Sequence, residues 1–354
     1  MMSTRRRKEE KQMNIHKILQ LIGRLSLLVF LVGCDDLVEG YVDQKPENVK
    51  TITITMVAKS SANPVFRSAQ IGAEAAAKAL TEKYSALEVK INWRTPVKEN
   101  ANLQAERIRN AVEDGTDAIL VSCSDTDTLT HVINDAVNRG TPVMTFDSDA
   151  PDSKRFAFYG VNDVELGENL MNEIAKLIGA KGQIAILGGN ALAPNLQKRI
   201  QGIKNRAANY PDIEIVTIAH HDETVEEAVA TVLSVNSKFP ELKGWAMVGG
   251  WAFFDEMLLD KLTPGDLKIV AVDALPVQLP YIEMGIVQAF LGQPTFKWGK
   301  VSVESIVGKL FLNKNVKEFN QMKPIRVSKD NLGGWSRQLR AWGYKDVPGK
   351  YLTW

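Results

Sequence analysis

Cysteine is almost absent from this sequence of 354 residues, which contains only Cys34 and Cys123. Two cysteines cannot build a disulfide framework or a cysteine-based zinc site, least of all if one of them is modified. Cys123 ends an apolar run that begins at Ala118, so we expect it to be a small buried core residue.

The chain also lacks an excess of either charge. It has 43 Lys and Arg against 42 Asp and Glu, a formal net charge of +1. Proteins that bind nucleic acids carry a basic face or stripe. The one basic run, Arg5-Arg6-Arg7-Lys8, precedes the main body of the chain. We therefore expect no nucleic-acid partner.

Motifs for phosphate binding, hydrolysis and metal binding are missing as well. The sequence has no Gly-x-x-x-x-Gly-Lys-Ser/Thr, Gly-x-Gly-x-x-Gly or Gly-x-Ser-x-Gly. Asp147-Ser148-Asp149 lacks the glycine and terminal glutamate of a calcium loop. The side chains of the adjacent His220 and His221 diverge on a strand. We expect neither a metal nor another cofactor.

The longest N-terminal apolar run, Leu25 to Val32, is too short to span a bilayer and has the form of a signal peptide. It ends in Leu31-Val32-Gly33-Cys34, which resembles the lipobox of bacterial lipoproteins, where the cysteine becomes the lipidated first residue. We expect a signal peptide over 1–34, lipidation of Cys34 and an extracytoplasmic, membrane-anchored protein. A plain secretory signal cut nearby is the alternative, and Met13 is an alternative start.

The polar segment 35–50 shows no periodicity and is expected to be a flexible tether. The rest of the chain is too long for one ordinary core. Hydrophobic residues make up 45% and charged residues 24%, as is typical of globular proteins.

Strand-like and helix-like segments alternate from Thr51 onward. Strands are expected over 51–57, 87–93, 118–121, 182–187, 213–218, 244–248, 269–272, 287–291 and 322–327, and a short buried strand is expected within 140–149. Helices are expected over 64–80, 101–112, 129–136, 166–178, 196–207, 228–235, 252–261, 280–284 and 296–311. This alternation, present twice, predicts an α/β fold with two Rossmann-like lobes, each with a parallel sheet, joined by a hinge.

The domain boundaries follow from the two series. We expect an N-terminal lobe of 51–160 with 294–321, and a C-terminal lobe of 161–293 with 322–335. The tail of 336–354 shows no clear structure in the sequence.

Two buried strands end in an aspartate, Asp147 after Thr145-Phe146 and Asp273 after Val270-Ala271-Val272. Ligands of open α/β sheets bind at the carboxyl ends of strands. We therefore expect each lobe to present one carboxylate to a shared cleft. The alternative is that both aspartates are helix N-caps.

Several segments, taken in order, are similar to the ribose-binding-protein family, the type I periplasmic sugar-binding proteins that share a fold with lactose-repressor-type regulators. The resemblance runs from about Thr51 to Val327. Its pieces are Lys59-Ser60-Ser61-Ala62-Asn63-Pro64-Val65-Phe66, Asp114-Gly115-Thr116-Asp117-Ala118-Ile119, Thr145-Phe146-Asp147-Ser148, Asn195-Leu196-Gln197-Lys198-Arg199-Ile200-Gln201-Gly202, Val270-Ala271-Val272-Asp273 and Gln293-Pro294.

The resemblance implies a sugar or polyol ligand. Aromatic rings cover the faces of a sugar ring, and charged or amide groups bond its hydroxyl rim. The expected ligand-binding residues are Asn63, Phe66, Ser122, Asp147, Ser148, Gln197, Arg199, Trp251, Asp273 and Gln293. In this set Asp147 and Asp273 accept hydrogen bonds from the sugar hydroxyls, and Phe66 and Trp251 form aromatic walls against the faces of the sugar ring. Trp93 and Trp298 are less certain walls.

Three of these positions have open alternatives. Asn63 before Pro64 is equally well a helix cap. Arg199 either reaches the cleft or lies too deep in its helix, in which case Gln197 takes its place. Trp93 is equally well explained as a core residue and as an aromatic wall of the sugar site.

Two departures from the family pattern alter the predicted pocket. Val65 replaces an aromatic residue of the family's Asn-Pro-Phe-Phe loop, and Gly249-Gly250-Trp251 stands where the ribose protein has Asn-Asp. Ribose itself is therefore not inferred.

The resemblance implies a monomeric binding protein, not an enzyme, that closes around its ligand and delivers it to an ABC permease. One alternative is a receptor that reports ligand to a membrane kinase or chemoreceptor. A less favoured alternative is an enzyme using Asp147 and Asp273 as acid and base. A cytoplasmic regulator is disfavoured because a secretion signal stands where a DNA-binding headpiece would be.

Overall fold

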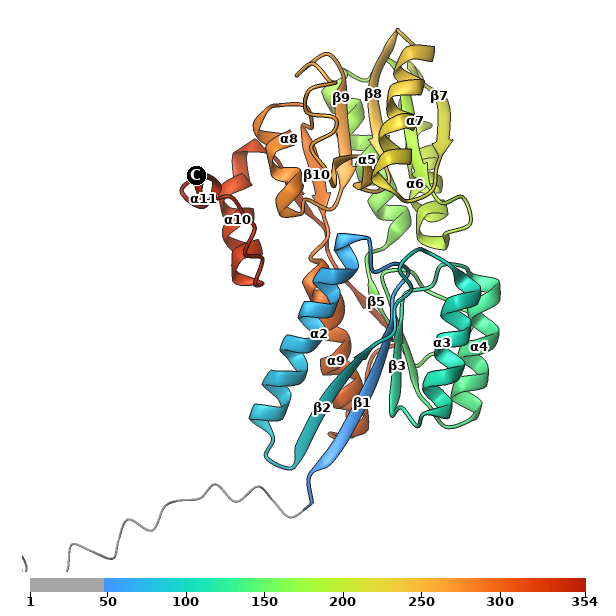
Figure 1. The fold of residues 1–354 in the computed structure, drawn as a ribbon. Coiled ribbons are helices and arrows are strands. Elements are labelled where there is room, and N and C mark those ends of the chain that lie inside the picture. The colour runs from blue at the N-terminus through green and yellow to red at the C-terminus, as the bar shows by residue number, and fades with distance from the viewer. Residues whose placement is uncertain (1–47) are drawn as a thin grey trace, which may run out of the picture. The chain divides into compact units, whose positions relative to one another are not determined.

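Two six-stranded β-sheets, each covered by helices, form the body of the computed structural model, which describes residues 48–354 (Figure 1). The expected signal peptide, the lipidated Cys34 and most of the tether lie outside the described residues. Within residues 48–354, no helix is long and apolar enough to cross a membrane.

The first sheet has the strand order β11-β5-β4-β3-β1-β2, with every neighbouring pair parallel. Its strands are β1 (Lys50–Val57), β2 (Leu87–Trp93), β3 (Ala118–Val121), β4 (Val143–Phe146), β5 (Ala157–Gly160) and β11 (Phe319–Gln321). Its helices are α2 (Pro64–Lys83), α3 (Ala101–Glu113), α4 (Thr126–Asn138) and α9 (Thr295–Leu310). We call this sheet with its helices the N-terminal lobe.

Side chains that alternate along these strands make two separate apolar layers. Met56 and Leu120 pack with residues of α2, whereas Val57 and Val121 pack with residues of α3 and α4. Figure 1 shows α2 and α9 on one side of the sheet and α3 and α4 on the other. The sheet is thus buried on both faces, as expected for parallel strands.

The second sheet has the order β12-β10-β9-β8-β6-β7 and is parallel except for the antiparallel pair of β10 and β12. Its strands are β6 (Gly182–Gly189), β7 (Ile213–His220), β8 (Leu242–Met247), β9 (Lys268–Val272), β10 (Ala289–Gly292) and β12 (Ile325–Val327). Its helices are α5 (Asp163–Leu177), α6 (Pro194–Ala207), α7 (Val225–Lys238) and α8 (Leu279–Glu283). We call this unit the C-terminal lobe, and the predicted two-lobed α/β fold is confirmed.

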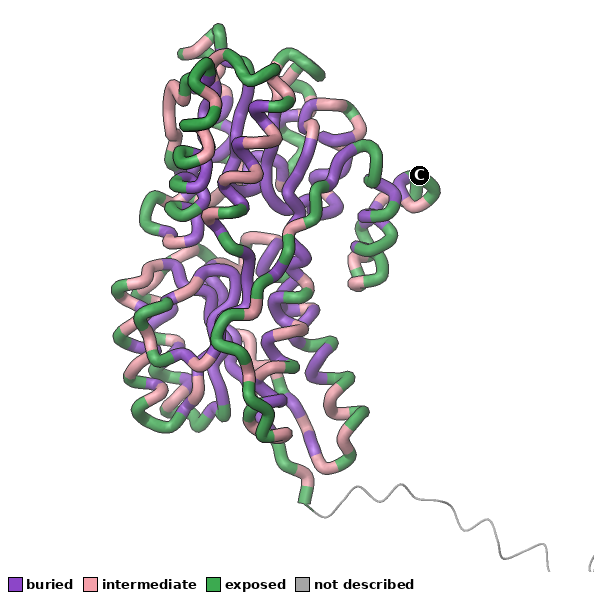
Figure 2. The backbone as a smooth tube through the Cα atoms, turned by 180° about the vertical axis from the view of Figure 1, so that it is seen from behind, coloured by how far each residue is buried: buried purple, intermediate pink, exposed green. Residues whose placement is uncertain are grey.

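The backbone burial seen in Figure 2 follows this layering, with buried strands inside and exposed turns outside.

The chain passes between the sheets three times, after β5, after β10 and after β11. The last passage explains one wrong prediction. Only Ile325–Val327 (β12) of the expected strand over 322–327 is a strand. A separate strand, β11 (Phe319–Gln321), precedes it in the other sheet, and Pro324, which has no N–H for a ladder, stands just before β12.

A second prediction, the helix over 252–261, is also wrong. The structure has a short 3-10 helix, Trp251–Phe253, followed by turns. The Tyr281 hydroxyl accepts from the Leu258 N–H at 3.2 Å and donates to the Asp255 carbonyl at 2.6 Å. A side chain therefore satisfies backbone groups that a helix would have paired.

The C-terminal residues do form regular structure, α10 (Leu332–Ala341) and α11 (Gly349–Leu352). The Trp335 Nε1 group donates to the carbonyl of Ala274 in the C-terminal lobe at 2.7 Å. Trp342 stacks on Phe296 of α9 in the N-terminal lobe, with ring centroids 6.0 Å apart. We call residues 332–354 the C-terminal strap, because it contacts both lobes.

Candidate functional site: a charged cavity between the two lobes

A cavity of about 30 Å³ lies where segments that follow the strands of both sheets meet. This space has room for about two water molecules. Its lining residues are Lys59, Asn63, Val65, Phe66, Asp147, Asn195, Leu196, Arg199, Glu223, Gly249, Trp251, Asp273, Gln293 and Trp298. The carboxyl ends of the strands in both sheets thus converge on one site, as in other open α/β folds.

Asp147 and Asp273 occupy corresponding positions in the two lobes. Each directly follows a central strand, β4 or β9, and each is buried. Their φ angles are 58° and 98°, in the left-handed region that few non-glycine residues occupy. Strained backbone of this kind gathers at functional sites. Neither residue caps a helix, so the alternative N-cap role is wrong.

The Asp147 carboxylate is contacted by side chains of its own lobe and of the opposite lobe. The Ser122 hydroxyl donates to Asp147 Oδ2 at 2.8 Å from within the same lobe. From the other lobe, Asn195 Nδ2 donates to Oδ1 at 3.4 Å, and Arg199 Nη2 lies 4.0 Å from the same oxygen. Ser122 therefore positions the carboxylate rather than lining the cavity.

Arg199 organises the C-terminal lobe's side of the site. Its guanidinium donates to Asp163 Oδ1 at 2.8 Å, to the Val248 carbonyl at 2.9 Å and to Gln293 Oε1 at 3.4 Å. Gln293 Nε2 in turn donates to Asp273 Oδ1 at 3.3 Å. Burial raises the pKa of Asp273 to about 6, although Arg199 and Gln293 act to lower it.

Lys59 connects the lobes from the loop after β1. Its side chain is 3% exposed, and Nζ donates to Asn195 Oδ1 at 2.9 Å and lies 3.9 Å from Glu99 Oε1. Burial acts to lower the pKa of Lys59, but Glu99 and Glu223 raise it, and the net direction is upward. The lysine is therefore charged in this site.

Glu223 reaches the cavity from the loop between β7 and α7. Its Oε2 accepts from Trp251 Nε1 at 3.1 Å, while its Oε1 is buried without a hydrogen-bond partner among residues 48–354. Burial, and then the nearby Glu99, raise the pKa of Glu223 to about 8.

Aromatic side chains form the apolar part of the wall. Phe66 and Trp298 stack at 28° with centroids 6.1 Å apart, and Phe146 packs against both. Trp251 stands on the opposite lobe. Rings and charged groups thus share one cavity, a combination suited to a ligand with apolar faces and a polar rim.

Seven of the ten predicted ligand-binding residues line this cavity, namely Asn63, Phe66, Asp147, Arg199, Trp251, Asp273 and Gln293. Ser148 is buried but does not line it. Gln197 is exposed, and its side chain donates to the Ala191 carbonyl, so Arg199 is the residue of that pair that reaches the site.

The remaining open alternatives are also decided by contacts. Asn63 Oδ1 accepts from the Val65 N–H at 3.2 Å, so the asparagine caps α2 as well as lining the cavity. Trp93 packs against the core and not in the cavity, whereas Trp298 does line it. Cys123 is buried, as expected.

Sequence reasoning missed three charged or polar residues of the wall, Lys59, Asn195 and Glu223. Lys59 and Asn195 stand inside segments that carried the family resemblance but were not singled out. Glu223 follows the strand β7, and the rule that ligands lie beyond strand ends was the signal that points to it.

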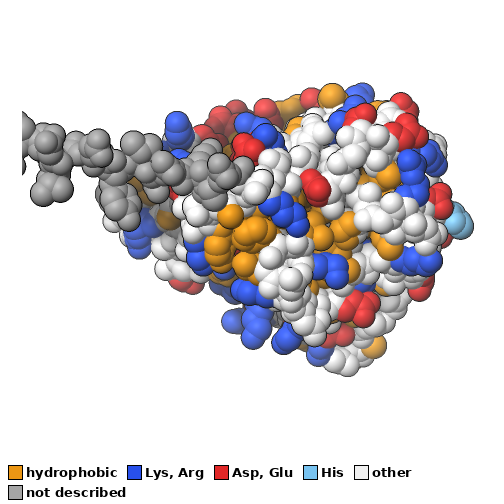
Figure 3. Space-filling model, turned by 90° about the horizontal axis from the view of Figure 1, so that it is seen from below, with side chains coloured by type: hydrophobic (Ala, Val, Ile, Leu, Met, Phe, Trp, Pro, Cys, Tyr) orange, Lys and Arg blue, Asp and Glu red, His pale blue; other side chains and the backbone are white. Residues whose placement is uncertain are grey.

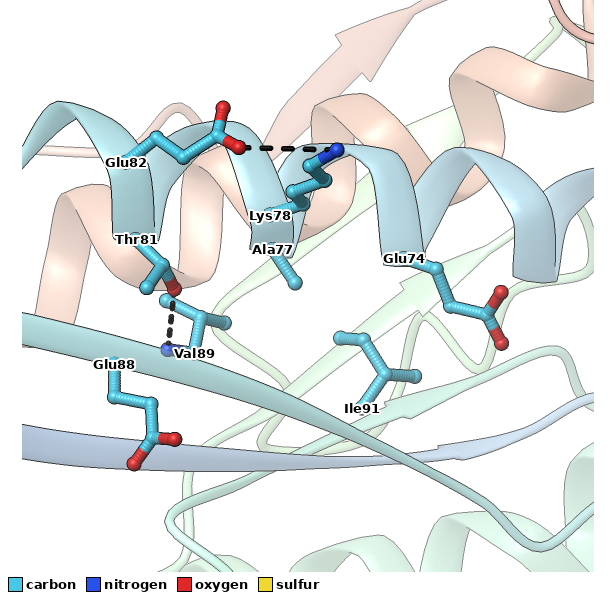
Figure 4. Close-up of a pocket in the computed structure, with 8 residues that line it drawn as sticks. All are labelled: Glu74, Ala77, Lys78, Thr81, Glu82, Glu88, Val89 and Ile91. Carbon is cyan, nitrogen blue, oxygen red and sulfur yellow. Dashed lines mark hydrogen bonds and ion pairs between the residues drawn. The ribbon is translucent and has the colours of Figure 1, made fainter.

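A larger groove of about 430 Å³ lies on the outside of the N-terminal lobe, between α2 and β2 (Figure 4). It is lined by Glu74, Ala77, Lys78, Thr81, Glu82, Glu88, Val89 and Ile91. All eight come from two neighbouring elements. Lys78 and Glu82 pair with one another at 3.8 Å, and Thr81 Oγ1 accepts from the Val89 N–H. This groove lacks the convergence of strand ends that marks the cavity between the lobes.

Charged side chains of both signs are mixed with apolar ones on the face shown in Figure 3, which offers no surface of a single sign. In the described part of the chain, no group of three or more His, Cys, Asp or Glu side chains is arranged to hold a metal ion.

The fold and the cavity together define a two-lobed binding protein. The sequence matches the model of the periplasmic binding protein domain over residues 54–312, and the chain belongs to this family. It is a family of binding proteins rather than enzymes, and membership implies a location outside the cytoplasm.

Relatives agree with this membership. The chain is 24% identical to the D-ribose/D-allose-binding protein of Pseudomonas aeruginosa over 288 residues, 76% of this chain and 85% of that protein. It is 23% identical to the ribose import binding protein RbsB of Bacillus subtilis over 263 residues, 73% of this chain and 81% of that protein. An ABC transporter solute-binding protein from Burkholderia graminis, solved with D-arabinose, has 26% identity and a TM-score of 0.72, covering 80% of this chain and 98% of that one.

Proposed function

We propose that this protein is an extracytoplasmic, lipid-anchored binding protein that captures a sugar or polyol between its lobes. It acts as a monomer held by lipid on Cys34, and it delivers the ligand to an ABC permease. The observation that carries the proposal is the placement of Asp147 and Asp273, one from each lobe, on a single cavity with aromatic walls. Family membership and the names of the sugar-binding relatives support it.

Binding requires the lobes to separate. The cavity of about 30 Å³ is far too small for a sugar ring, and Lys59, Asn195 and Arg199 bridge it. A ligand enters when these bonds break, and its hydroxyls then replace them as the links between Asp147 and Asp273. Contacts to both lobes favour the closed state, whose surface the permease reads.

Isothermal titration calorimetry against pentoses, hexoses and inositols tests the ligand class. We expect at least one compound to bind with one-to-one stoichiometry and without turnover. Product formation would instead support the enzyme alternative, and the absence of binding by every compound would contradict the proposal.

Anchoring and delivery are tested separately in cells. Replacing Cys34 with Ala should release the protein from the membrane fraction, and deletion of the gene should abolish uptake of the labelled ligand. Retention of the Cys34→Ala variant would point to another attachment. Unchanged uptake with an altered transcriptional response to the ligand would favour the sensory alternative.

A further inference from the structure

Acidic side chains outnumber basic ones in and around the cavity. Lys59 and Arg199 line it together with Asp147, Asp273 and Glu223. Asp163 and Glu99 lie beside the two basic residues outside the lining. Arg199 is already bonded to Asp163 at 2.8 Å, and Lys59 lies near Glu99. A surplus of buried carboxylates is costly unless a cation or several donors compensate it.

Glu223 is a carboxylate that lines the cavity and has an open oxygen. Its Oε1 is buried and has no hydrogen-bond partner within the described residues, while Oε2 is bonded to the Trp251 indole. Burial and Glu99 raise the pKa of Glu223 to about 8, so without a ligand the group is mainly protonated near neutral pH. An ammonium group placed against Oε1 favours the ionised carboxylate, which accepts hydrogen bonds only, whereas a neutral hydroxyl supplies no such charge.

The walls around Glu223 suit such a donor. Trp251, bonded to the same carboxylate, lines the cavity, and the face of an indole ring attracts ammonium groups. Phe66 and Trp298 offer apolar surface on the other lobe for a sugar ring.

We propose that the ligand of this cavity is a sugar bearing a free amino group, whose ammonium binds the open carboxylate oxygen of Glu223. This inference rests on the proposed function and narrows its ligand class. The ring hydroxyls bind Asp147 and Asp273, and the ammonium supplies the positive charge that the surrounding carboxylates lack.

Calorimetry on the purified full chain tests the inference with three matched sets: D-glucosamine, D-galactosamine and D-mannosamine, each beside its neutral parent sugar and its N-acetyl derivative. In at least one set the amino sugar should bind ten or more times more tightly than both other members. The N-acetyl derivative retains the nitrogen but not the charge, so it separates charge from shape.

The variant Glu223→Gln should lose most of the preference for the amino sugar over its neutral and N-acetyl forms. Glu226→Gln, the same change at an exposed position on α7, should retain it. Neutral sugars that bind as well as their amino counterparts in every set would overturn the inference and leave the proposed function standing. Failure of all nine sugars to bind would overturn the inference, and failure of the pentoses and inositols as well would overturn the proposed function. If Glu223→Gln does not fold, the comparison of the three sugar forms on the unaltered protein decides alone.

Discussion

The Nζ atom of Lys59 lies 2.9 Å from Oδ1 of Asn195, and this hydrogen bond joins the two lobes across the cavity. Lys59 follows β1 of one sheet and Asn195 lies at the start of α6 on the other. Both side chains are buried. The closed arrangement is thus stabilised by the protein's own groups.

Replacing Lys59 with Met should therefore weaken the closed state. A hydrogen bond to a charged group contributes about 1.5–3 kcal/mol, and its loss leaves Glu99 and Glu223 without their nearest cation. Small-angle X-ray scattering without ligand should give a larger radius of gyration. Lys98→Met, at an exposed position of the same lobe, is the control. An unchanged radius in the Lys59 variant would show that other contacts hold the lobes together.

Asp147→Asn should lower ligand affinity while the fold persists. Asparagine tolerates the left-handed backbone at φ 58° and keeps the shape of the side chain, while the charge and one of the two acceptor oxygens are lost. Loss of a charged hydrogen bond of about 1.5–3 kcal/mol corresponds to roughly 10- to 100-fold in affinity. Asp147→Ala, which removes the acceptor altogether, should abolish binding. Calorimetry measures the affinity and circular dichroism the fold; native affinity in both variants would remove Asp147 from the site.

The positions of Asp147 and Asp273 show why a side chain at the end of a buried strand can be predicted from sequence to reach the binding site. A buried strand followed by an aspartate fixes both the element and the edge of the sheet at which the side chain emerges. Arg199 was also accessible in principle. It lies three residues after Leu196 and four before Ile203, on the buried stripe of α6, whereas Gln197 does not.

This reasoning failed for Glu223, which lines the cavity but was not predicted, and for Ser148, which was predicted but does not line it. Both lie in loops, whose conformation depends on contacts with distant parts of the chain. Glu223 is turned inward by its bond to Trp251, 28 residues later in the sequence. Ser148 lies one residue beyond Asp147, but the sharp backbone turn there directs it away from the cavity.

The raised pKa of Asp273 predicts opposite pH dependences for stability and for binding. Burial raises this pKa to about 6, above the value of about 3.9 in an unfolded chain. Between these values the folded protein binds more protons than the unfolded one, so the free energy of unfolding should fall as pH rises from about 4 to 6. Ligand affinity should rise as pH passes 6, because the ionised carboxylate is the stronger acceptor.

Calorimetry and urea unfolding at several pH values test this. Asp273→Asn should remove the rise in affinity near pH 6, and Asp266→Asn, at an exposed position, should keep it. Burial also raises the pKa of Asp163 to about 6, so the stability change should shrink in Asp273→Asn without disappearing. Affinity that is flat across pH 6 in the unaltered protein would contradict the role of Asp273.

Close packing of α2 against α9 depends on Gly299. A Cβ atom at this position would lie 1.8 Å from the carbonyl oxygen of Ala69, which is backbone of the neighbouring helix. Gly299→Ala should force the helices apart and lower the free energy of unfolding by about 1–3 kcal/mol. Gly308 lies on the same helix, and a Cβ there would meet only the Lys314 side chain at 3.7 Å, an ordinary contact, so Gly308→Ala should instead raise stability by about 0.5–1 kcal/mol. If Gly299→Ala and Gly308→Ala change the free energy of unfolding in urea by the same amount, close contact between the helices does not explain why glycine is needed at position 299.

The C-terminal strap should contribute to the coupling between the lobes. Trp342 stacks on Phe296 of α9 with an interplanar angle of 3°, while Trp335 is bonded to Ala274, directly after Asp273. The strap therefore spans the two lobes outside the segment matched by the family model. Trp342→Ala removes the contact with the N-terminal lobe and leaves the Trp335 anchor on the other.

We expect Trp342→Ala to lower the free energy of unfolding by about 0.5–1.5 kcal/mol beyond the loss of buried area, the range for aromatic pairs. We also expect faster ligand dissociation, because the strap no longer resists separation of the lobes. Stopped-flow fluorescence measures the rate. Trp354→Ala is the matched control, since Trp354 packs on Tyr351 within the strap. If both variants change dissociation equally, the strap acts through its own folding; if only Trp342→Ala does, it acts through the contact with α9.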